Sequence, residues 1–525
     1  MKPIRAVLAL IAMLCLPAFP AQSEQFKYAF RIDANSLDPY ALAETFTLAF
    51  QGLVYEPLIG RGKDLEIVPA LATEWKTTAP DTWRFKLRPN VKFADGSPFT
   101  ADDVIFSYER AQKPGSDVEY VVADIKEIRK VDDLTIDIVT KGPYPILPQR
   151  VTTWYIMSKA WSEKNGATEP SSVKKEIKNF ATTNANGTGP FMIKSRQQDV
   201  KTVLVPNPNW WGDVEHNLTE VTFTPIKSDA TRVAALLSGE VDMIYPVPLQ
   251  DVDRVNGASG VSVLQGPEMR TIFLNMDQTR DELIESNIKG KNPFKDRRVR
   301  RAVYQAIDIE AIKDKVMRGA STPAAIMVAP GVVGFDASLN DRFPHDPSMS
   351  KSLLAEAGYP DGFEVGMDCP NDRYVNDEKI CLAVVGMLAK VGIKVNLLAQ
   401  TRSKYFEKIL SRNTSMSLLG WQPLTYDSHS PLQAVMSSYD QEVGTGTYNV
   451  GGYSNAALDA LTKVVAVEID PVKRQQLISG AMLIHKNDFG HIPLHQQALA
   501  WGVRDNVELV QRADDSFDLR WVVVK

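Results

Sequence analysis

Residues 363–400, FEVGMDCPNDRYVNDEKICLAVVGMLAKVGIKVNLLAQ, contain the pattern that decides the fold class. Residues 363–369 predict a strand that ends at Cys369, and residues 393–400 predict a second strand. Between them, Asn376 is placed to cap a helix that Gly392 closes. The apolar stripe of this helix consists of Ile380, Val384, Met387, Leu388 and Val391. A strand, a helix and a strand in this order are typical of an α/β domain with a parallel sheet.

The same alternation extends on both sides of this stretch. Residues 403–411 predict a helix and residues 415–421 a strand, while helical patterns begin at Lys295 and near residue 347. We therefore expect the C-terminal half to be an α/β domain with a largely parallel core. The loop after Cys369 would lie at the carboxyl edge of a strand, where open α/β sheets bind ligands.

The N-terminal half is richer in strand patterns. Residues 26–32 predict a strand, and in residues 83–88 Trp, Phe and Leu alternate with basic residues, as in a half-buried strand. Thr100, with Asp103 three positions later, predicts the start of a helix. A mature chain of about 500 residues exceeds a single hydrophobic core, so two or three domains are expected.

The first residues, MKPIRAVLALIAMLCLPAFPAQSEQ, are typical of a secretory signal. Lys2 and Arg5 precede an apolar run at residues 7–21, and Ala21-Gln22-Ser23 suits cleavage before Glu24. The run is about 15 residues long, whereas a spanning helix needs roughly 20. We therefore expect residues 1–23 to be a cleaved signal peptide that directs the chain to the periplasm; a retained anchor is the alternative.

Cys369 and Cys381 are the two cysteines of the expected mature chain, because Cys15 lies inside the signal. Two cysteines can be zinc ligands, a redox pair, a disulfide or buried thiols. A closed zinc site needs four ligands, and an oxidising compartment favours a disulfide. The histidines offer no replacement, since His491 and His495 are separated by Pro493 and the others are scattered. The sequence thus favours a Cys369–Cys381 disulfide and no metal site.

Composition and motifs exclude several functions. The formal net charge is −5, and it becomes −7 without Lys2 and Arg5; with no basic cluster, this argues against nucleic acid. The chain lacks G-x-S-x-G, H-E-x-x-H and P-loop signatures. We therefore expect no cofactor and no enzymatic activity, with a secreted hydrolase as the least favoured alternative.

Two loops carry the candidate binding residues. Arg373 follows the strand that ends at Cys369, and Asp427 follows the strand that ends at Gly420-Trp421. Alone, Arg373 could be a solvated loop charge and Asp427 an Asx-turn residue. Together, on neighbouring strands, they could present a fork donor and an acceptor to one cleft.

Eight segments carry a resemblance to a known family. They are VYEPLI (54–59), PALATEW (69–75), WRFKLRPNVKFADGSPFTADDVIFSYERA (83–111), GTGPFMI (187–193), PNPNWWG (206–212), NPFKDRRVRRAVYQAID (292–308), LLAEAGYPDG (353–362) and HIPLHQQ (491–497). In this order they resemble the extracellular solute-binding proteins of family 5, the dipeptide- and oligopeptide-binding proteins of ABC importers. The resemblance covers essentially the whole mature chain.

The resemblance implies an α/β, two-lobed periplasmic binding protein of type II, similar to cluster C, with an extra domain inserted in the first lobe. It implies lobe I in residues 24–57, 184–274 and 499–525, the extra domain in 58–183, and lobe II in 275–498. It also implies a monomer that captures a short peptide or similar small solute by lobe closure. The ligand would then pass to ABC permease subunits in the inner membrane.

The resemblance also assigns roles to the two loops. In the peptide-binding branch, an Asp after Gly-Trp holds the ligand's ammonium; Asp427 matches it, and Pro431 matches as well. The spacing departs from the pattern, because five residues separate Trp421 from Asp427. The Arg of an Arg-Tyr-x-Asn loop holds the carboxylate, and Arg373 matches it. The disulfide would then brace the loop that presents Arg373.

The ligand class is the least determined part of these predictions. Family members also bind opines, oligosaccharides, haem and metal chelates, and Trp421, Tyr426 and Tyr374 would suit a stacked sugar. Further candidates for the cleft lining are Arg270, Glu44 and Phe46. No residue set in the sequence favours direct metal coordination.

Overall fold

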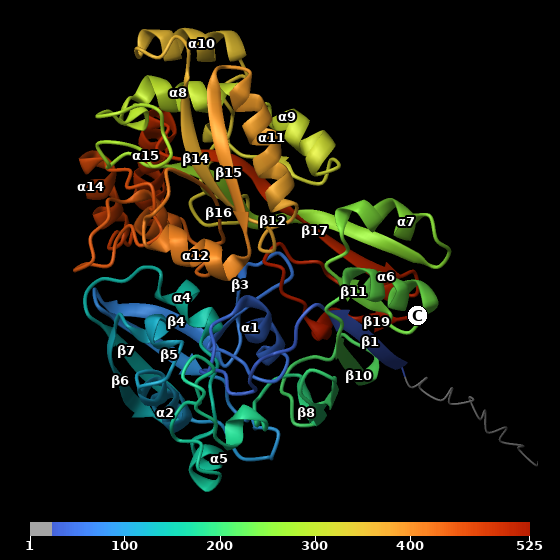
Figure 1. The fold of residues 1–525 in the computed structure, drawn as a ribbon. Helices are drawn as coiled ribbons and strands as arrows, with labels where there is room; N and C mark the ends of the chain where they lie inside the picture. Colours follow the sequence, from blue (N-terminus) through green and yellow to red (C-terminus); the bar gives the residue numbers. More distant parts are fainter. Residues whose placement is uncertain (1–23) are drawn as a thin grey trace, which may run out of the picture.

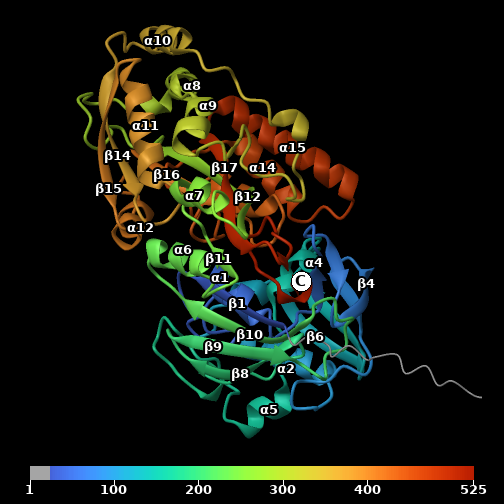
Figure 2. The same ribbon diagram turned by 90° about the vertical axis from the view of Figure 1, so that its right-hand side faces the viewer.

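The computed structural model describes residues 24–525, so the predicted signal peptide lies outside the described residues. The described chain forms two lobes, one above the other in Figure 1. The lower lobe contains the N-terminal segments and strands β1 and β8–β11. The upper lobe contains strands β14–β16 and helices α8–α15, and Figure 2 shows the same division from the side.

One mixed sheet runs through both lobes. Within residues 24–525 it has eleven strands in the order β15-β14-β16-β12-β17-β11-β1-β10-β9-β8, with β13 paired to β17. Its strands are β1 (Glu24–Phe30), β8 (Phe191–Gln197), β9 (Lys201–Pro206), β10 (Leu218–Pro225), β11 (Met243–Tyr245), β12 (Val261–Met276), β13 (Thr322–Pro323), β14 (Phe363–Pro370), β15 (Ile393–Gln400), β16 (Met416–Trp421) and β17 (Ile492–Arg504).

The long antiparallel strands β12 and β17 connect the lobes (Figures 1 and 2). Their pairing is interrupted between Pro267, opposite Ala498, and Thr271, opposite Gln496. Three residues, 268–270, therefore face the single residue Gln497. Such a bulge bends the strand locally and redirects its side chains, so it turns the charged pair Glu268 and Arg270 out of the regular ladder.

The lower lobe has an aromatic core behind β1. Tyr28 lies 5.0 Å from Phe223 between ring centroids, and both side chains are almost fully buried. Its helices are α1 (Thr45–Gln51), α2 (Ala101–Ala111), α3 (Glu119–Val122), α4 (Leu147–Arg150), α5 (Lys159–Lys164), α6 (Asp229–Ser238) and α7 (Val252–Asn256). Short ladders join β2 (Ile59–Arg61) to β3 (Ile67–Pro69) and β18 (Val507–Glu508) to β19 (Val523–Val524).

A separate four-stranded antiparallel sheet lies inside the predicted extra-domain range. It has the order β4-β5-β7-β6, from β4 (Ala72–Ala79), β5 (Thr82–Leu87), β6 (Ile125–Asp132) and β7 (Thr135–Thr140). It has its own hydrophobic core with α2, in which Phe85, Val104 and Ile136 are fully buried. The Thr100–Asp103 capping box predicted for α2 is present. The domain boundaries themselves stay predictions.

The upper lobe contains the predicted βαβα pattern. Strand β14 pairs in parallel with β15 and β16, whereas β12 pairs antiparallel with β16 and β17. The expected largely parallel core is therefore correct for β14–β16 and wrong for the two connecting strands. Its helices are α8 (Arg297–Ala306), α9 (Ile309–Ala311), α10 (Pro347–Glu356), α11 (Asp377–Ala389), α12 (Arg402–Leu410), α13 (His429–Pro431), α14 (Ala456–Val465) and α15 (Pro471–Asp488).

Candidate functional site

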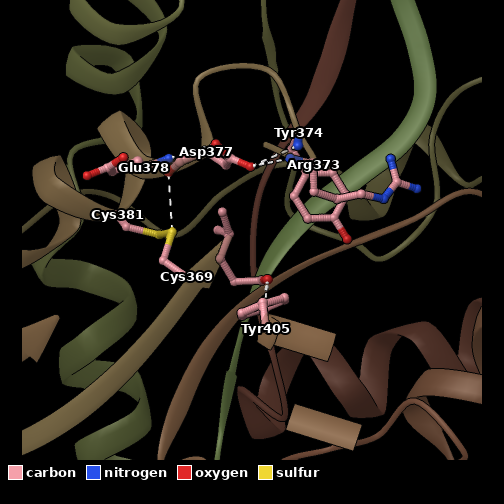
Figure 3. Close-up of a disulfide and its surroundings, with 8 residues drawn as sticks. Cys369, Arg373, Tyr374, Asp377, Glu378, Cys381 and Tyr405 are labelled. Atoms are coloured by element: carbon pink, nitrogen blue, oxygen red, sulfur yellow. Dashed lines mark hydrogen bonds between the residues drawn. A yellow bond between two sulfur atoms is a disulfide. The ribbon is translucent and has the colours of Figure 1, made fainter. Parts of the chain in front are cut away.

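The loop between β14 and α11 is closed by the predicted disulfide. Cys369 is the last residue but one of β14, Cys381 lies early in α11, and their sulfur atoms are bonded with Cα atoms 6.6 Å apart (Figure 3). In the chain-entropy description a bridge of this span stabilises the fold by about 3 kcal/mol. The loop it encloses contains Arg373 and Tyr374.

Asp377 holds the backbone of this loop. Its carboxylate accepts hydrogen bonds from the backbone N–H groups of Arg373 and Tyr374, both at 2.9 Å (Figure 3). The capping role predicted for Asn376 is wrong: Asn376 has a left-handed backbone with φ 54°, and its side chain donates to the Val316 carbonyl instead. The Val375 N–H donates to Gln497 at 3.0 Å, which ties the loop to the bulge. These polar contacts therefore fix the backbone of the loop at Arg373.

The Arg373 guanidinium has no hydrogen-bond acceptor among residues 24–525. It lies over the Tyr374 ring, whose centroid is 5.0 Å from the guanidinium carbon. Figure 3 shows the guanidinium directed away from the disulfide. Burial lowers the Arg373 pKa, and the positive charge of Arg270 lowers it further. The loop thus presents a half-buried cation whose five N–H donors are free.

Glu268 and Arg270 form an ion pair at the bulge. The Arg270 Nε donates to Glu268 at 3.0 Å, and the second Glu268 oxygen accepts from Gln497 at 2.6 Å. The Arg270 Nη2 donates to Gln422 at 2.5 Å. Arg270 does not line the pocket described below, and its charge is already neutralised by Glu268, so its predicted place in the cleft stays a prediction.

Asp515 lies within the electrostatic influence of the same ion pair, where Glu268 acts on it more strongly than Arg270 does. Its carboxyl accepts a hydrogen bond from the Trp501 Nε1 at 3.1 Å, and no cation pairs with it within residues 24–525. Burial, followed by the negative charge of Glu268, raises the Asp515 pKa to about 7. An uncompensated cation, Arg373, and an uncompensated carboxyl, Asp515, therefore both lie within electrostatic range of the Glu268–Arg270 pair.

Asp427 is not a free acceptor in this structure. Its two oxygens accept from the Arg474 guanidinium at 2.7 and 2.8 Å, and Oδ1 also accepts from the His429 N–H. The Asp427 side chain is fully buried. The structure therefore does not bring Asp427 together with Arg373, and Asp427 links its loop to helix α15.

The predicted aromatic residues surround the junction between the lobes. The Trp421 Nε1 donates to Ser430 at 3.2 Å, and the Tyr374 hydroxyl donates to the Gly420 carbonyl at 3.4 Å. The Tyr426 hydroxyl donates to Asp514 at 2.7 Å. Of these residues, Tyr426 lines the cleft pocket described below.

Glu44 and Phe46 belong to the start of helix α1. The Glu44 carboxylate accepts from the Phe46 and Thr47 backbone N–H groups and so caps the helix. The Phe46 ring stacks on Phe30 with centroids 4.2 Å apart, and Phe46 is 5% exposed. In the described structure both residues stabilise the lower lobe and present no free polar group to the cleft.

A pocket of about 920 Å³, which includes space open to solvent, lies between the lobes. Residues from α1, from the chain around β2 and from residues 152–155 form its lower wall. Gln422, Leu424 and Tyr426 form the upper wall, and the C-terminal segment 512–520 completes it. The pocket therefore joins the two lobes, and Gln422 belongs both to it and to the Arg270 contact.

Sequence reasoning missed Glu268, Gln497, Asp515 and Gln422. Two opposite charges two residues apart in a strand that has no other charged residue, Glu268 and Arg270, are a signal that could have indicated the bulge. Asp515 has no such signal, because it is one of several acidic residues near the C-terminus. Residues 24–525 contain no cluster of three or more metal-ligating side chains and no helix suited to crossing a membrane.

Two lobes joined by paired strands, with a pocket between them and an unpaired cation beside the bulge in those strands, define a two-lobed ligand-binding protein. The sequence matches the family described as "Bacterial extracellular solute-binding proteins, family 5 Middle" over residues 66–442. This match covers more than half of the chain, so the protein belongs to that family.

Individual relatives agree with this assignment. The glutathione-binding protein GsiB of Salmonella paratyphi A is 26% identical over 493 residues, which cover 91% of this chain and 90% of the relative. Among solved structures, the ABC transporter substrate-binding protein CtaP of Listeria monocytogenes has a TM-score of 0.83 at 21% identity, covering 96% of this chain and 99% of CtaP. DppA of Helicobacter pylori, in complex with the peptide STSA, has a TM-score of 0.75 at 22% identity, with coverage of 96% and 98%.

Proposed function

We propose that this protein is the periplasmic substrate-binding component of an ABC importer and that it binds short peptides with a free carboxylate. The observation that carries the proposal is the Arg373 guanidinium, which is half-buried near the Glu268–Arg270 pair without an acceptor within residues 24–525. A planar fork of this kind matches a carboxylate through two parallel hydrogen bonds. One relative is named a glutathione-binding protein and another is described in complex with the peptide STSA, and both descriptions agree with such a ligand.

Asp515 is the proposed partner of the ligand's ammonium group. Its carboxyl has no cation within residues 24–525 and lies near Glu268, so a ligand cation would relieve the repulsion between these two acids. The role first expected for Asp427 passes to Asp515, because Arg474 already occupies both Asp427 oxygens. Opposite charges on the two sides of the Glu268–Arg270 pair would then orient a zwitterion.

Lobe closure and delivery complete the proposal. The bulge at 268–270 interrupts the β12–β17 ladder between the lobes, which makes it the proposed hinge. A ligand that contacts both lobes favours the closed state through its extra contacts there. The closed monomer would release intact peptide to permease subunits in the inner membrane, without catalysis.

A carbohydrate is the competing ligand, because aromatic rings lie near the cleft. Their polar atoms are engaged: Trp421 with Ser430, Tyr374 with Gly420, and Tyr426 with Asp514. A neutral sugar carries no charge that would pair with the free Arg373 guanidinium. The charge pattern therefore favours the peptide.

The test is a binding screen with purified mature protein. Short peptides, their C-terminal amides, glutathione and neutral oligosaccharides are titrated by calorimetry, and recovered ligands are weighed by mass spectrometry. We expect free-acid peptides to bind and to be recovered unchanged. Tight binding of a neutral oligosaccharide without any peptide binding, or turnover that mutation abolishes, would refute the proposal.

A further inference from the structure

Arg61 is a second arginine with unused donors in the cleft. It ends strand β2, lines the pocket between the lobes and is 8% exposed. Its Nη1 donates to the Leu65 carbonyl at 2.9 Å, whereas its Nε and Nη2 are buried and have no hydrogen-bond partner within residues 24–525. Buried donors without acceptors are rare in folded proteins, and each such group calls for an explanation.

The two unused donors lie on one edge of the guanidinium. In the same protein, Arg84 uses its Nε and Nη2 to hold both oxygens of Asp137, at 2.7 and 2.8 Å. Arg61 therefore presents the edge that matches a carboxylate through two parallel hydrogen bonds. The Tyr426 ring, 4.1 Å from the guanidinium carbon, holds the plane of this edge by stacking.

No carboxylate of the described chain is free to fill this position. The nearest acidic groups are engaged: Asp514 accepts from Arg512, Ser516 and Tyr426, and Asp427 accepts from Arg474. Burial lowers the Arg61 pKa, and the charge of Arg512 adds to this effect. The pocket therefore contains a guanidinium edge whose two donors find no acceptor within residues 24–525.

We infer that Arg61 binds a second carboxylate of the ligand, so that the preferred peptides carry an acidic side chain in addition to their terminal carboxylate. This inference rests on the proposed function, in which Arg373 takes the terminal carboxylate. Gln422 connects the two positions, because it lines the Arg61 pocket and accepts from Arg270 beside Arg373. Both positions are therefore tied to the wall of the same pocket between the lobes.

The test uses tripeptides that differ by one isosteric change. Tri-alanine peptides carry Glu at position 1, 2 or 3, each paired with Gln at the same position, and calorimetry measures their affinities. For at least one position, we expect Glu to bind 10- to 100-fold more tightly than Gln. In Arg61→Met this ratio falls to about 1, and in Arg61→Lys, which keeps the charge without the fork, it is intermediate.

Arg88→Met is the matched control. Arg88 also stacks on an aromatic ring, Trp211 at 3.7 Å, but it does not line the pocket, so the Glu-to-Gln ratio should be unchanged. Equal affinity for Glu and Gln at every position, or a Glu preference that survives both Arg61 variants, would overturn the inference and leave the proposed function intact. If no tripeptide binds the wild-type protein, the proposed function fails and this inference fails with it.

Discussion

The loops of Asp427 and Arg373 follow two neighbouring strands of one sheet, and each presents a charged residue, yet the charges are in opposite states. Asp427 is fully buried and both its oxygens are held by Arg474. Arg373 is held by its backbone alone, and its guanidinium is free of acceptors within residues 24–525. A charge that the fold already neutralises stabilises the lobe, whereas a charge that the fold leaves open is available to a ligand.

The largest effect should come from breaking the buried ion pair between Asp427 and Arg474. Asp427→Asn leaves the buried Arg474 without its carboxylate, so the free energy of unfolding should fall by about 3–5 kcal/mol. Denaturant unfolding measures this loss. At a temperature where the variant is fully folded, its peptide affinity should stay within about threefold of wild type, because Arg474 already occupies both Asp427 oxygens and the proposed ligand partner is Asp515.

The control for this variant is an ion pair between a carboxylate and a cation that is exposed to solvent. Lys63 and Glu215 are 2.7 Å apart with side chains that are about half exposed, so Glu215→Gln should cost no more than about 1 kcal/mol. Asp427 would be a ligand-binding residue after all if its substitution abolished peptide binding while leaving stability unchanged.

Removing the disulfide should affect Arg373 indirectly, through the loop that carries this residue. The double change Cys369→Ser and Cys381→Ser removes the bridge that closes the Arg373 loop, and stability should fall by about 3 kcal/mol. Affinity should fall less, by up to about tenfold, because Asp377 still holds the loop backbone. Unaltered stability in unfolding experiments, or two reactive thiols in oxidised wild-type protein, would contradict this account.

The smallest predicted effect is a pH dependence that comes from Asp515. Burial and Glu268 raise its pKa to about 7, so in the unliganded protein it is largely protonated at pH 6. A ligand ammonium needs the ionised carboxylate, so binding releases a proton there. Affinity for a free-amine peptide should therefore fall as the pH is lowered from 8 to 5.5, by at most about tenfold per pH unit below 7.

The pH dependence of the folding stability that comes from Asp515 has the opposite sign to that of ligand affinity. Because the folded pKa is raised above the usual value of about 3.8, protonation of Asp515 stabilises the unliganded fold at acid pH, and this contribution is lost as the pH rises through about 7. The groups that face Asp515 are Glu268, Asp514, Arg270 and Trp501, and Asp515→Asn keeps their packing. Calorimetry on this variant should show no pH slope; an unchanged slope would assign the titration to another group.

The sequence was sufficient for the local elements of the upper lobe. The stripe from Ile380 to Val391 identified α11, and the expected oxidising compartment, with only two cysteines left in the mature chain, identified the disulfide at its start. The antiparallel direction of β12 and β17 was not predictable, since these strands are about 215 residues apart and an apolar run does not encode its partner.

The candidate site was predictable only in part for a related reason. Arg373 could be found because a charge in a loop between a strand and a helix lies at a binding edge. Whether the Asp427 carboxylate is free or already paired depends on Arg474, which lies 47 positions away in the sequence and carries no local signal. Asp515 and Arg61 become candidates only once their surroundings, with no partner of opposite charge, are known.

The central claim is that Arg373 receives the ligand's carboxylate, and a double-mutant cycle tests it most directly. Calorimetry compares one peptide as free acid and as C-terminal amide, in wild-type protein and in Arg373→Met. We predict that amidation weakens wild-type binding by about 10- to 1000-fold, equivalent to about 1.4–4 kcal/mol, and that it has almost no effect in the variant. If the variant discriminates between acid and amide as strongly as the wild type does, Arg373 is not the carboxylate partner.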